Sequence, residues 1–199
     1  MADGAQTPEA EIRLWDLGTR VFHWALTLFF AVSFLLGEFG PAIMTWHFWS
    51  GYAIAGLLAF RMLWGLVGPR PARFSDFLRP PSEAWAYVKH VWRREPSLWP
   101  GHNPLGGYWI TAVLLLLIAQ ISTGLIADPE DYINVGPFAD MVSDSMSRWA
   151  LAQHHRLSSV LLAMVVLHIA AIVFYAVWKR ENLVRPMIHG RKRVRQTRH

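Results

Sequence analysis

Four long apolar stretches separated by polar connections dominate the sequence. They cover approximately residues 21–37, 42–67, 105–126 and 151–178. Each comes close to or exceeds the roughly 20 residues that a helix needs to cross a bilayer. Because lipid offers no partner for backbone N–H and C=O groups, a spanning segment must satisfy them internally, which favours helices. The pattern therefore predicts an all-α protein, an integral membrane four-helix bundle.

Local signals refine the third span and the connection before it. Asn103 is suited to cap the third helix, and Pro104 suits its first position. In the preceding connection, residues 83–94 carry apolar side chains at helical spacing: Trp85, Val88 and Trp92. The sequence predicts a short helix there, lying in the membrane interface.

Positive charge is distributed unevenly over the connections. Lys and Arg are frequent near both ends and after the second stretch, whereas the 127–150 connection has five acidic residues and only Arg148. Cytoplasmic connections carry the excess of Lys and Arg. The sequence therefore predicts a cytoplasmic N-terminal segment (1–20), a four-helix transmembrane domain (21–178) with a cytoplasmic loop (68–104) and a periplasmic loop (127–150), and a basic cytoplasmic tail (179–199).

Composition narrows the possible chemistry. The chain has 11 Trp and 11 Phe, most of which we expect at membrane interfaces and on lipid-facing surfaces. It has no Cys, which excludes disulfides, thiolate-bound iron–sulfur clusters and covalent c-type haem. We expect the basic tail to be solvated and to face lipid headgroups, so membrane lipid is a predicted partner and nucleic acid is not.

Histidines are the main candidates for chemistry. Four of the nine lie in connections or the tail, where we expect solvated side chains: His90, His102, His189 and His199. Within a membrane span an ionisable side chain is costly and marks a functional site. Five histidines lie in the predicted spans or at their edges: His23, His47, His154, His155 and His168.

Spacing separates the histidines of the fourth span. His154 and His168 are 14 residues apart, which returns to within about 40° of the same helix face and rises about 21 Å. His155 and His168 are 13 residues apart and lie about 140° from each other around the helix. His154 and His168 thus share a face but are too far apart to hold one small metal ion. They suit two separate haems, one near each membrane surface.

Depth in the membrane supplies a second ligand for each haem. Span one starts at the cytoplasmic side, which places His23 in the inner leaflet, and span two starts at the other side, which places His47 in the outer leaflet. Span four also starts outside, so His154 is outer and His168 is inner. The predicted pairs of axial ligands to the haem iron are His47 with His154, and His23 with His168.

Three arginines are candidates for binding haem propionates. Arg61 lies within span two, 14 residues after His47, so it shares that face at the inner level and needs an anionic partner. Arg20 lies close to the inner ligands, and Arg156 lies close to the outer ones. No catalytic residue is predicted.

Several segments together resemble a known family. They are WDLGTRVFHW (15–24), His47 followed by Gly51, FRMLWG (60–65), GHNPLG (101–106), the stretch from His154 to His168, and RPMIHG (185–190). The chain resembles the bacterial di-haem b-type cytochromes, which include the cytochrome b561 proteins and the b-type subunits of nickel–iron hydrogenases. This family often has Glu after the first histidine of span four, where this chain has His155, and helical register favours His154 as the ligand.

The resemblance implies two non-covalent b haems, each with two His ligands. It also implies electron transfer across the membrane between the quinone pool and a partner redox protein, which would be a hydrogenase, a dehydrogenase or a cytochrome c. Together with the charge distribution, it predicts a multi-pass protein of the bacterial inner membrane with both termini in the cytoplasm. Whether the chain has a quinone oxidoreductase activity of its own stays open.

Two other functions are considered. A stand-alone superoxide:quinone oxidoreductase would need a cationic outer surface to attract its anionic substrate, and the acidic 127–150 connection disfavours this. A haem-free metal-binding or transport protein is disfavoured by the ligand separation of about 21 Å along span four. The acidic connection is either a docking surface for a basic periplasmic partner or an ordinary solvated loop.

Overall fold

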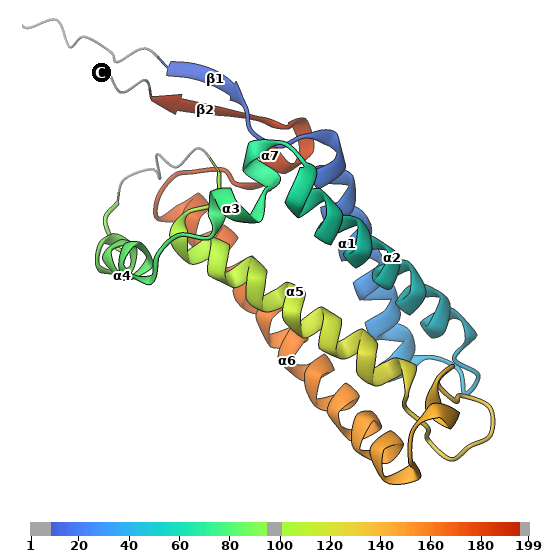
Figure 1. Cartoon of the computed structure of the whole chain (residues 1–199). Coiled ribbons are helices and arrows are strands. Elements are labelled where there is room, and N and C mark those ends of the chain that lie inside the picture. The colour runs from blue at the N-terminus through green and yellow to red at the C-terminus, as the bar shows by residue number, and fades with distance from the viewer. Residues whose placement is uncertain (1–8, 95–100, 196–199) are drawn as a thin grey trace, which may run out of the picture. The chain divides into compact units, whose positions relative to one another are not determined.

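Four long apolar helices confirm the predicted all-α membrane fold. The structure is a computed structural model that describes residues 9–94 and 101–195, so the predictions for His199 and for the ends of the chain lie outside it. Within the described residues, the helices long and apolar enough to cross a membrane are α1 (Leu17–Phe39), α2 (Thr45–Val67), α5 (Pro104–Leu125) and α6 (Asp144–Val177) (Figure 1).

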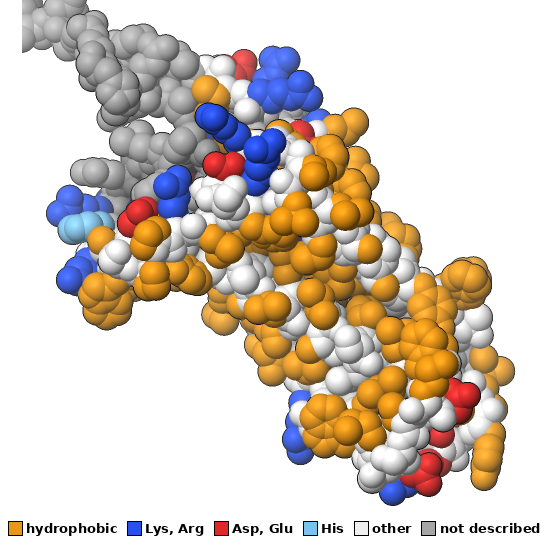
Figure 2. All heavy atoms as spheres, viewed as in Figure 1, with side chains coloured by type: hydrophobic (Ala, Val, Ile, Leu, Met, Phe, Trp, Pro, Cys, Tyr) orange, Lys and Arg blue, Asp and Glu red, His pale blue; other side chains and the backbone are white. Residues whose placement is uncertain are grey.

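The spans leave most of their apolar side chains exposed. In the most apolar part of each span, only 6%, 28%, 17% and 11% of the residues are buried, in chain order. Figure 2 shows hydrophobic side chains covering the viewed face of these helices. Such a surface is unfavourable in water, because exposed apolar area costs free energy. Lipid is the environment in which these helices are stable.

Shorter elements join and flank the spans. They are the strand β1 (Glu9–Arg13), the 3-10 helix η1 (Arg70–Ala72), α3 (Phe74–Phe77), α4 (Pro81–His90), the 3-10 helix η2 (Ala139–Met141), α7 (Val184–His189) and the strand β2 (Arg191–Arg195). β1 and β2 pair antiparallel, with Ile12 opposite Lys192. This two-stranded sheet is an addition that the sequence pattern did not predict.

Two spans begin earlier than their apolar stretches. α1 begins at Leu17 because Asp16 caps it: Thr19 donates its backbone N–H to Asp16 Oδ1 at 3.0 Å and its hydroxyl to Oδ2 at 2.6 Å. α6 begins at Asp144, not near residue 151, because the Ser143 hydroxyl accepts from the Met146 N–H at 3.3 Å. Asp144 in the first turn of α6 also stabilises the helix, because its negative charge interacts favourably with the helix dipole.

The chain divides into two compact units. The helical unit comprises residues 22–63 and 109–168, and the flanking unit comprises the described residues of 1–21, 64–108 and 169–199. The helical unit contains all five span histidines. Its buried apolar side chains come from all four helices: Phe22 of α1, Ile54 and Leu58 of α2, Leu114 and Leu117 of α5, and Ala150 and Leu161 of α6.

One asparagine ties two connections of the helical unit together. Asn134 Oδ1 accepts from the Met44 N–H at 2.9 Å, and Asn134 Nδ2 donates to the Ala42 carbonyl at 2.7 Å. The turn between α1 and α2 is thereby fixed to the 127–143 connection between α5 and α6.

The flanking unit brings together, among the described residues, the segment before the first span, the segment after the last span and parts of the 68–104 connection. Trp64 Nε1, near the end of α2, donates to Asp16 Oδ1 at 3.1 Å. Leu14 N–H donates to the Gly190 carbonyl at 2.8 Å. In the tail, Lys179 is buried, and Lys192 forms a 2.6 Å ion pair with buried Glu181. The expectation of a solvated tail is therefore wrong for Lys179 and Lys192.

The short helix and the start of α5 meet in a polar cluster of the flanking unit. Asn103 accepts from the Gly106 N–H at 2.7 Å, which confirms the predicted cap. Its Nδ2 donates to the Tyr175 hydroxyl at 2.9 Å and to the Tyr87 hydroxyl at 3.1 Å. The predicted short helix exists as α4, but it ends at His90, so Trp92 lies beyond it.

Trp92 is held by the end of α6. Its carbonyl accepts from the Trp178 indole at 3.0 Å, and its ring lies edge-on to Phe174. His102 is also packed: its ring lies 4.5 Å from that of Trp15 and 5.3 Å from that of Phe77, measured between ring centres. The prediction of a solvated His102 is therefore wrong.

Candidate functional site

The helical unit brings the span histidines together as two pairs from different helices. The rings of His47 on α2 and His154 on α6 have centres 6.0 Å apart. The rings of His23 on α1 and His168 on α6 have centres 6.4 Å apart. These are the pairs that depth and helical register predicted. Their role as ligands stays a prediction.

His47 is oriented by the neighbouring helix α1. Its Nδ1 lies 2.8 Å from the backbone carbonyl of Ser33, and since a carbonyl can only accept, Nδ1 carries the proton. The Ser33 hydroxyl lies 3.3 Å from the same nitrogen. The lone pair of the His47 ring is therefore on Nε2, which leaves Nε2 as the nitrogen able to bind a metal.

His154 is oriented in the same way by α5. Its Nδ1 donates to the backbone carbonyl of Gln120 at 3.0 Å, and the side-chain amide of Gln120 donates to its Nε2 at 3.1 Å. The Thr123 hydroxyl lies 3.4 Å from Nδ1. The sequence analysis missed Gln120, although a polar residue inside the third apolar stretch was a usable signal.

The second pair lacks such contacts. In the described part of the chain, Nδ1 of His23 is buried without a hydrogen-bond partner. A buried polar nitrogen without a partner costs roughly 1–3 kcal/mol, so the fold keeps this nitrogen unpaired at a cost in stability. His168 faces it from α6 and is exposed.

The ring separations suit one shared metal ion per pair. Imidazole nitrogens bind a metal ion at about 2 Å, so two nitrogens on opposite sides of one ion lie about 4 Å apart. Ring centres lie about 1 Å further back on each side, which gives a separation of about 6 Å. Two imidazoles alone leave the other positions of an iron ion to a flat, four-coordinating group, and a haem meets that requirement.

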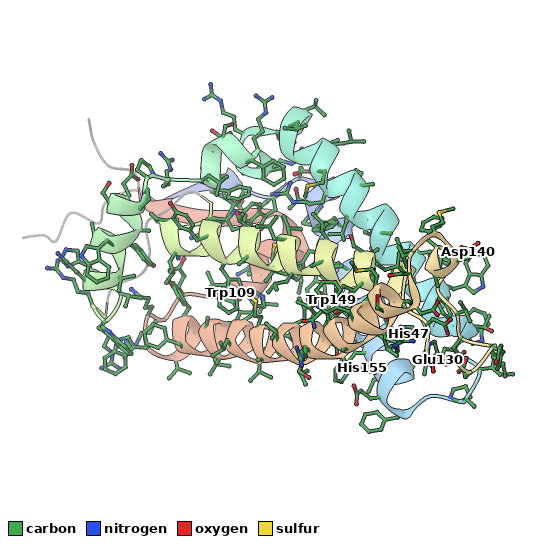
Figure 3. The ribbon with its side chains drawn as sticks, turned by 60° about the horizontal axis from the view of Figure 1, so that its bottom comes forward. His47, Trp109, Glu130, Asp140, Trp149 and His155 are labelled. Atoms are coloured by element: carbon green, nitrogen blue, oxygen red, sulfur yellow. The ribbon has the colours of Figure 1, made fainter. Side chains whose placement is uncertain are left out.

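A cavity surrounds the His47–His154 pair. Its volume is about 230 Å³, and mostly apolar side chains line it, together with Glu38, Asp131 and Asn134. His155 also lines it, and Figure 3 shows His47 and His155 at the end of the helical unit where Glu130 lies. A planar, largely apolar ligand fits the apolar part of this lining.

Glycines lie beside His47 and His154, where a larger side chain would come close to a histidine ring or fill open space. A Cβ on Gly124 would lie 2.8 Å from Cε1 of His154, and one on Gly37 would lie 3.2 Å from Cε1 of His47. A Cβ on Gly51 would meet nothing within 4 Å. Gly51 follows His47 by four residues, so both share one helix face. The open space beside Gly51 is available to a bound group.

His155 lines the cavity beside His154, whereas Arg156 lies on another part of the α6 surface. His155 is exposed, and its ring centre lies 6.5 Å from that of His154. Arg156 is exposed and is absent from the cavity lining, since two residues after His154 place it about 200° around the helix. The structure therefore does not bring Arg156 to the cavity, and its propionate role stays a prediction.

The remaining two arginines lie in different units. Arg61 of the helical unit is only 4% exposed, as expected of a cation that faces the helix interior. Arg20 belongs to the flanking unit, where its guanidinium donates to the Ile188 carbonyl. This contact with α7 does not test a role for Arg20 in binding a propionate.

The described residues contain no group of three or more His, Cys, Asp and Glu side chains placed to hold a metal ion. A site for a bare metal ion usually needs at least three such protein ligands. Pairs of imidazoles are therefore better suited to haem iron than to a bare ion.

Comparison with known proteins identifies the family. The sequence pattern of the family described as prokaryotic cytochrome b561 matches residues 14–190. The "Probable Ni/Fe-hydrogenase B-type cytochrome subunit" of Bradyrhizobium diazoefficiens is 24% identical over 92% of this chain and 87% of its own length. The protein of the same name from Azotobacter vinelandii is 24% identical over 92% of this chain and 85% of its own length.

No solved structure matches the chain. The matched region contains both histidine pairs and all four spans. A b-type cytochrome of this kind carries haem b and serves in electron transfer. Because the family's pattern matches nearly the whole of this chain, the chain belongs to the prokaryotic cytochrome b561 family.

Proposed function

We propose that this cytochrome binds two b haems and transfers electrons across the bacterial inner membrane, between the quinone pool and a partner redox protein. The observation that carries the proposal is the pairing of His47 with His154 and of His23 with His168. Since His154 and His168 are separated by about 21 Å along α6, the two pairs lie at different depths. This arrangement supports one haem towards each membrane surface.

The histidines hold the cofactors and set their chemistry. Each haem supplies an iron that gains and loses one electron. Backbone carbonyls hold the Nδ1 atoms of His47 and His154, which leaves Nε2 of each ring as the nitrogen that would bind the iron. Binding would displace the Gln120 amide from Nε2 of His154. Mostly apolar side chains line the cavity around the first pair. Arg61 is suited to hold a propionate at the depth of the second pair.

The orientation in the membrane follows from charge and pairing. β1 precedes the first span and β2 follows the last, and their pairing supports a placement of both ends of the chain on one side. Lys and Arg concentrate in these ends and in the 68–104 connection. By the positive-inside rule, we place them in the cytoplasm and the 127–150 connection in the periplasm.

The partner is proposed from the relatives and from charge. Both relatives are named as hydrogenase subunits, which supports a hydrogenase as the partner, with a dehydrogenase or a cytochrome c as other possibilities. The 127–150 connection carries exposed acidic residues that suit the docking of a partner with a basic surface: Glu130, Asp131, Asp140 and Asp144. The same charge disfavours superoxide as a substrate, because an anion is repelled.

Haem quantitation tests the proposal. We expect the purified protein in detergent to contain two b haems per chain, measured as pyridine haemochrome, and to show a b-type α-band on reduction. His47→Ala and His168→Ala should each remove one haem, and the double variant should remove both, because each pair loses one of its ligands. His90→Ala, which changes an exposed histidine of α4, is the control and should retain both. A colourless protein, or full haem content in the double variant, would refute the proposal.

A further inference from the structure

The two histidine pairs differ in what surrounds their Nδ1 atoms. His47 Nδ1 donates to the Ser33 carbonyl at 2.8 Å, and His154 Nδ1 donates to the Gln120 carbonyl at 3.0 Å. Among the described residues, the buried Nδ1 of His23 has no hydrogen-bond partner, and the ring of His168 forms no hydrogen bond. The two sites are therefore chemically unequal.

This inequality bears on the affinity of each site for an electron. A carbonyl that accepts the Nδ1 proton makes Nε2 more basic, so the imidazole becomes a stronger electron donor to its metal. Stronger donation stabilises the more highly charged ferric state relative to the ferrous state. Hydrogen bonding around the ligands is accordingly one of the means by which a protein sets the reduction potential of haem iron.

Charges in the helical unit act in the same direction. Glu38 and Asp131 line the cavity around His47 and His154, and negative charge favours the ferric state. Arg61 follows His47 by 14 residues on α2, as His168 follows His154 on α6. Both helices start at the end that carries the 127–143 connection, so the buried Arg61 lies at about the depth of His168. A cation there favours the ferrous state.

We propose that the Ser33 and Gln120 carbonyls make the His47–His154 site the lower-potential one of the two haem sites. The inference rests on the proposed function. It also gives electron transfer a direction: an electron donated by a reduced partner protein at the His47–His154 site moves downhill to the His23–His168 site and from there to a quinone. Two such transfers, with two protons taken from the adjoining aqueous phase, convert one quinone to a quinol.

Axial ligand exchange assigns the potentials. Replacing a His ligand by Met raises the reduction potential of the haem that it binds. We would titrate the wild-type protein, His154→Met and His168→Met in lipid nanodiscs at one pH, following the reduced α-band against electrode potential. The wild-type protein should give two one-electron steps. His154→Met should raise the lower step and leave the upper one in place, and His168→Met should raise the upper step.

The outcomes separate this inference from the proposed function. If His154→Met moves the upper step, or if the wild-type steps coincide, the inference is overturned while the two-haem function stands. Should a Met variant lose its haem, the assignment is read from which wild-type step disappears: loss of the lower step in His154→Met supports the inference, and loss of the upper step overturns it. A wild-type protein without haem would overturn the proposed function and the inference with it.

Discussion

The ring of His47 on α2 faces that of His154 on α6 with centres 6.0 Å apart and planes at 77° to each other. Each ring is fixed from a different neighbouring helix, His47 by α1 through Ser33 and His154 by α5 through Gln120. All four helices of the unit therefore contribute to the orientation of one histidine pair. Rings that are oriented before a cofactor arrives lose little conformational entropy when it binds.

Replacement of the adjacent histidines distinguishes the ligand from its neighbour. We expect His154→Ala to lose one of the two haems, because a proposed axial ligand is removed. His155→Ala should retain both, since its exposed ring has no hydrogen bond to α5. Pyridine haemochrome content per chain measures both. Loss of haem in His155→Ala with full content in His154→Ala would reverse the assignment.

Three glycine variants probe the space around the first pair. Gly124→Ala should lose the haem of the His47–His154 site, because its Cβ would lie 2.8 Å from His154 Cε1. Gly51→Ala is tolerated by the protein itself, as its Cβ meets nothing within 4 Å, but it should weaken haem binding if the haem fills that space. Haem content and thermal stability are measured for each variant.

Gly56→Ala is the matched control for this series. Its Cβ also meets nothing within 4 Å, but Gly56 follows His47 by nine residues and so lies on the opposite face of α2. It should keep both haems. Equal haem content in Gly51→Ala and Gly56→Ala would show that no macrocycle occupies the space beside Gly51.

Removal of the Asp16 cap should destabilise the start of α1. Asp16→Ala loses the hydrogen bonds from Thr19, and N-cap replacements of this kind cost about 1 kcal/mol. Unfolding by denaturant in detergent measures the free energy of unfolding of each variant. Asp76→Ala, an exposed residue of α3, serves as the control for removal of a carboxylate. An unfolding free energy equal to that of the wild-type protein would mean that the cap contributes nothing.

Asp16 also predicts a dependence of stability on pH. Burial raises its pKa, but hydrogen bonds from Thr19 and Trp64 outweigh burial and lower the pKa below its ordinary value of 3.8. A carboxyl whose pKa is lower in the folded state stabilises the fold above pH 3.8, and this contribution is lost as the pH falls through the lowered value. The stability difference between wild type and Asp16→Asn should therefore shrink below pH 3.8. A difference that is constant from neutral pH to pH 3 would contradict this.

Charge on the 127–150 connection should control the encounter with a basic partner. Glu130→Gln together with Asp140→Asn removes two exposed carboxylates and should slow reduction by a basic cytochrome c on the order of a few-fold at low salt. The effect should disappear at high ionic strength. Glu83→Gln, on α4 of the flanking unit, is the control and should leave the rate unchanged. If the rate of reduction does not depend on these carboxylates, the 127–150 connection is better interpreted as an ordinary solvated loop.

Periodicity was enough to predict the spans, and spacing was enough to predict the pairs. Apolar length alone identifies four membrane helices, because lipid imposes a minimum number of residues on each. The repeat of the helix then relates His154 to His168 and His47 to Arg61. The boundaries were less well predicted: α6 starts at Asp144, since its first turns are polar and only a cap at Ser143 marks them.

The sequence by itself therefore determined the fold class, the number of spans and the histidines that share a depth, because all of these follow from distances along a single helix. It did not determine the β1–β2 pairing, the packing of His102 between Trp15 and Phe77, or the burial of Lys179. Nor did it determine the carbonyls of Ser33 and Gln120 that orient His47 and His154. These contacts join residues far apart in the chain, and backbone carbonyls are the same in every residue. Only the packing of one helix against another decides which carbonyl meets which ring.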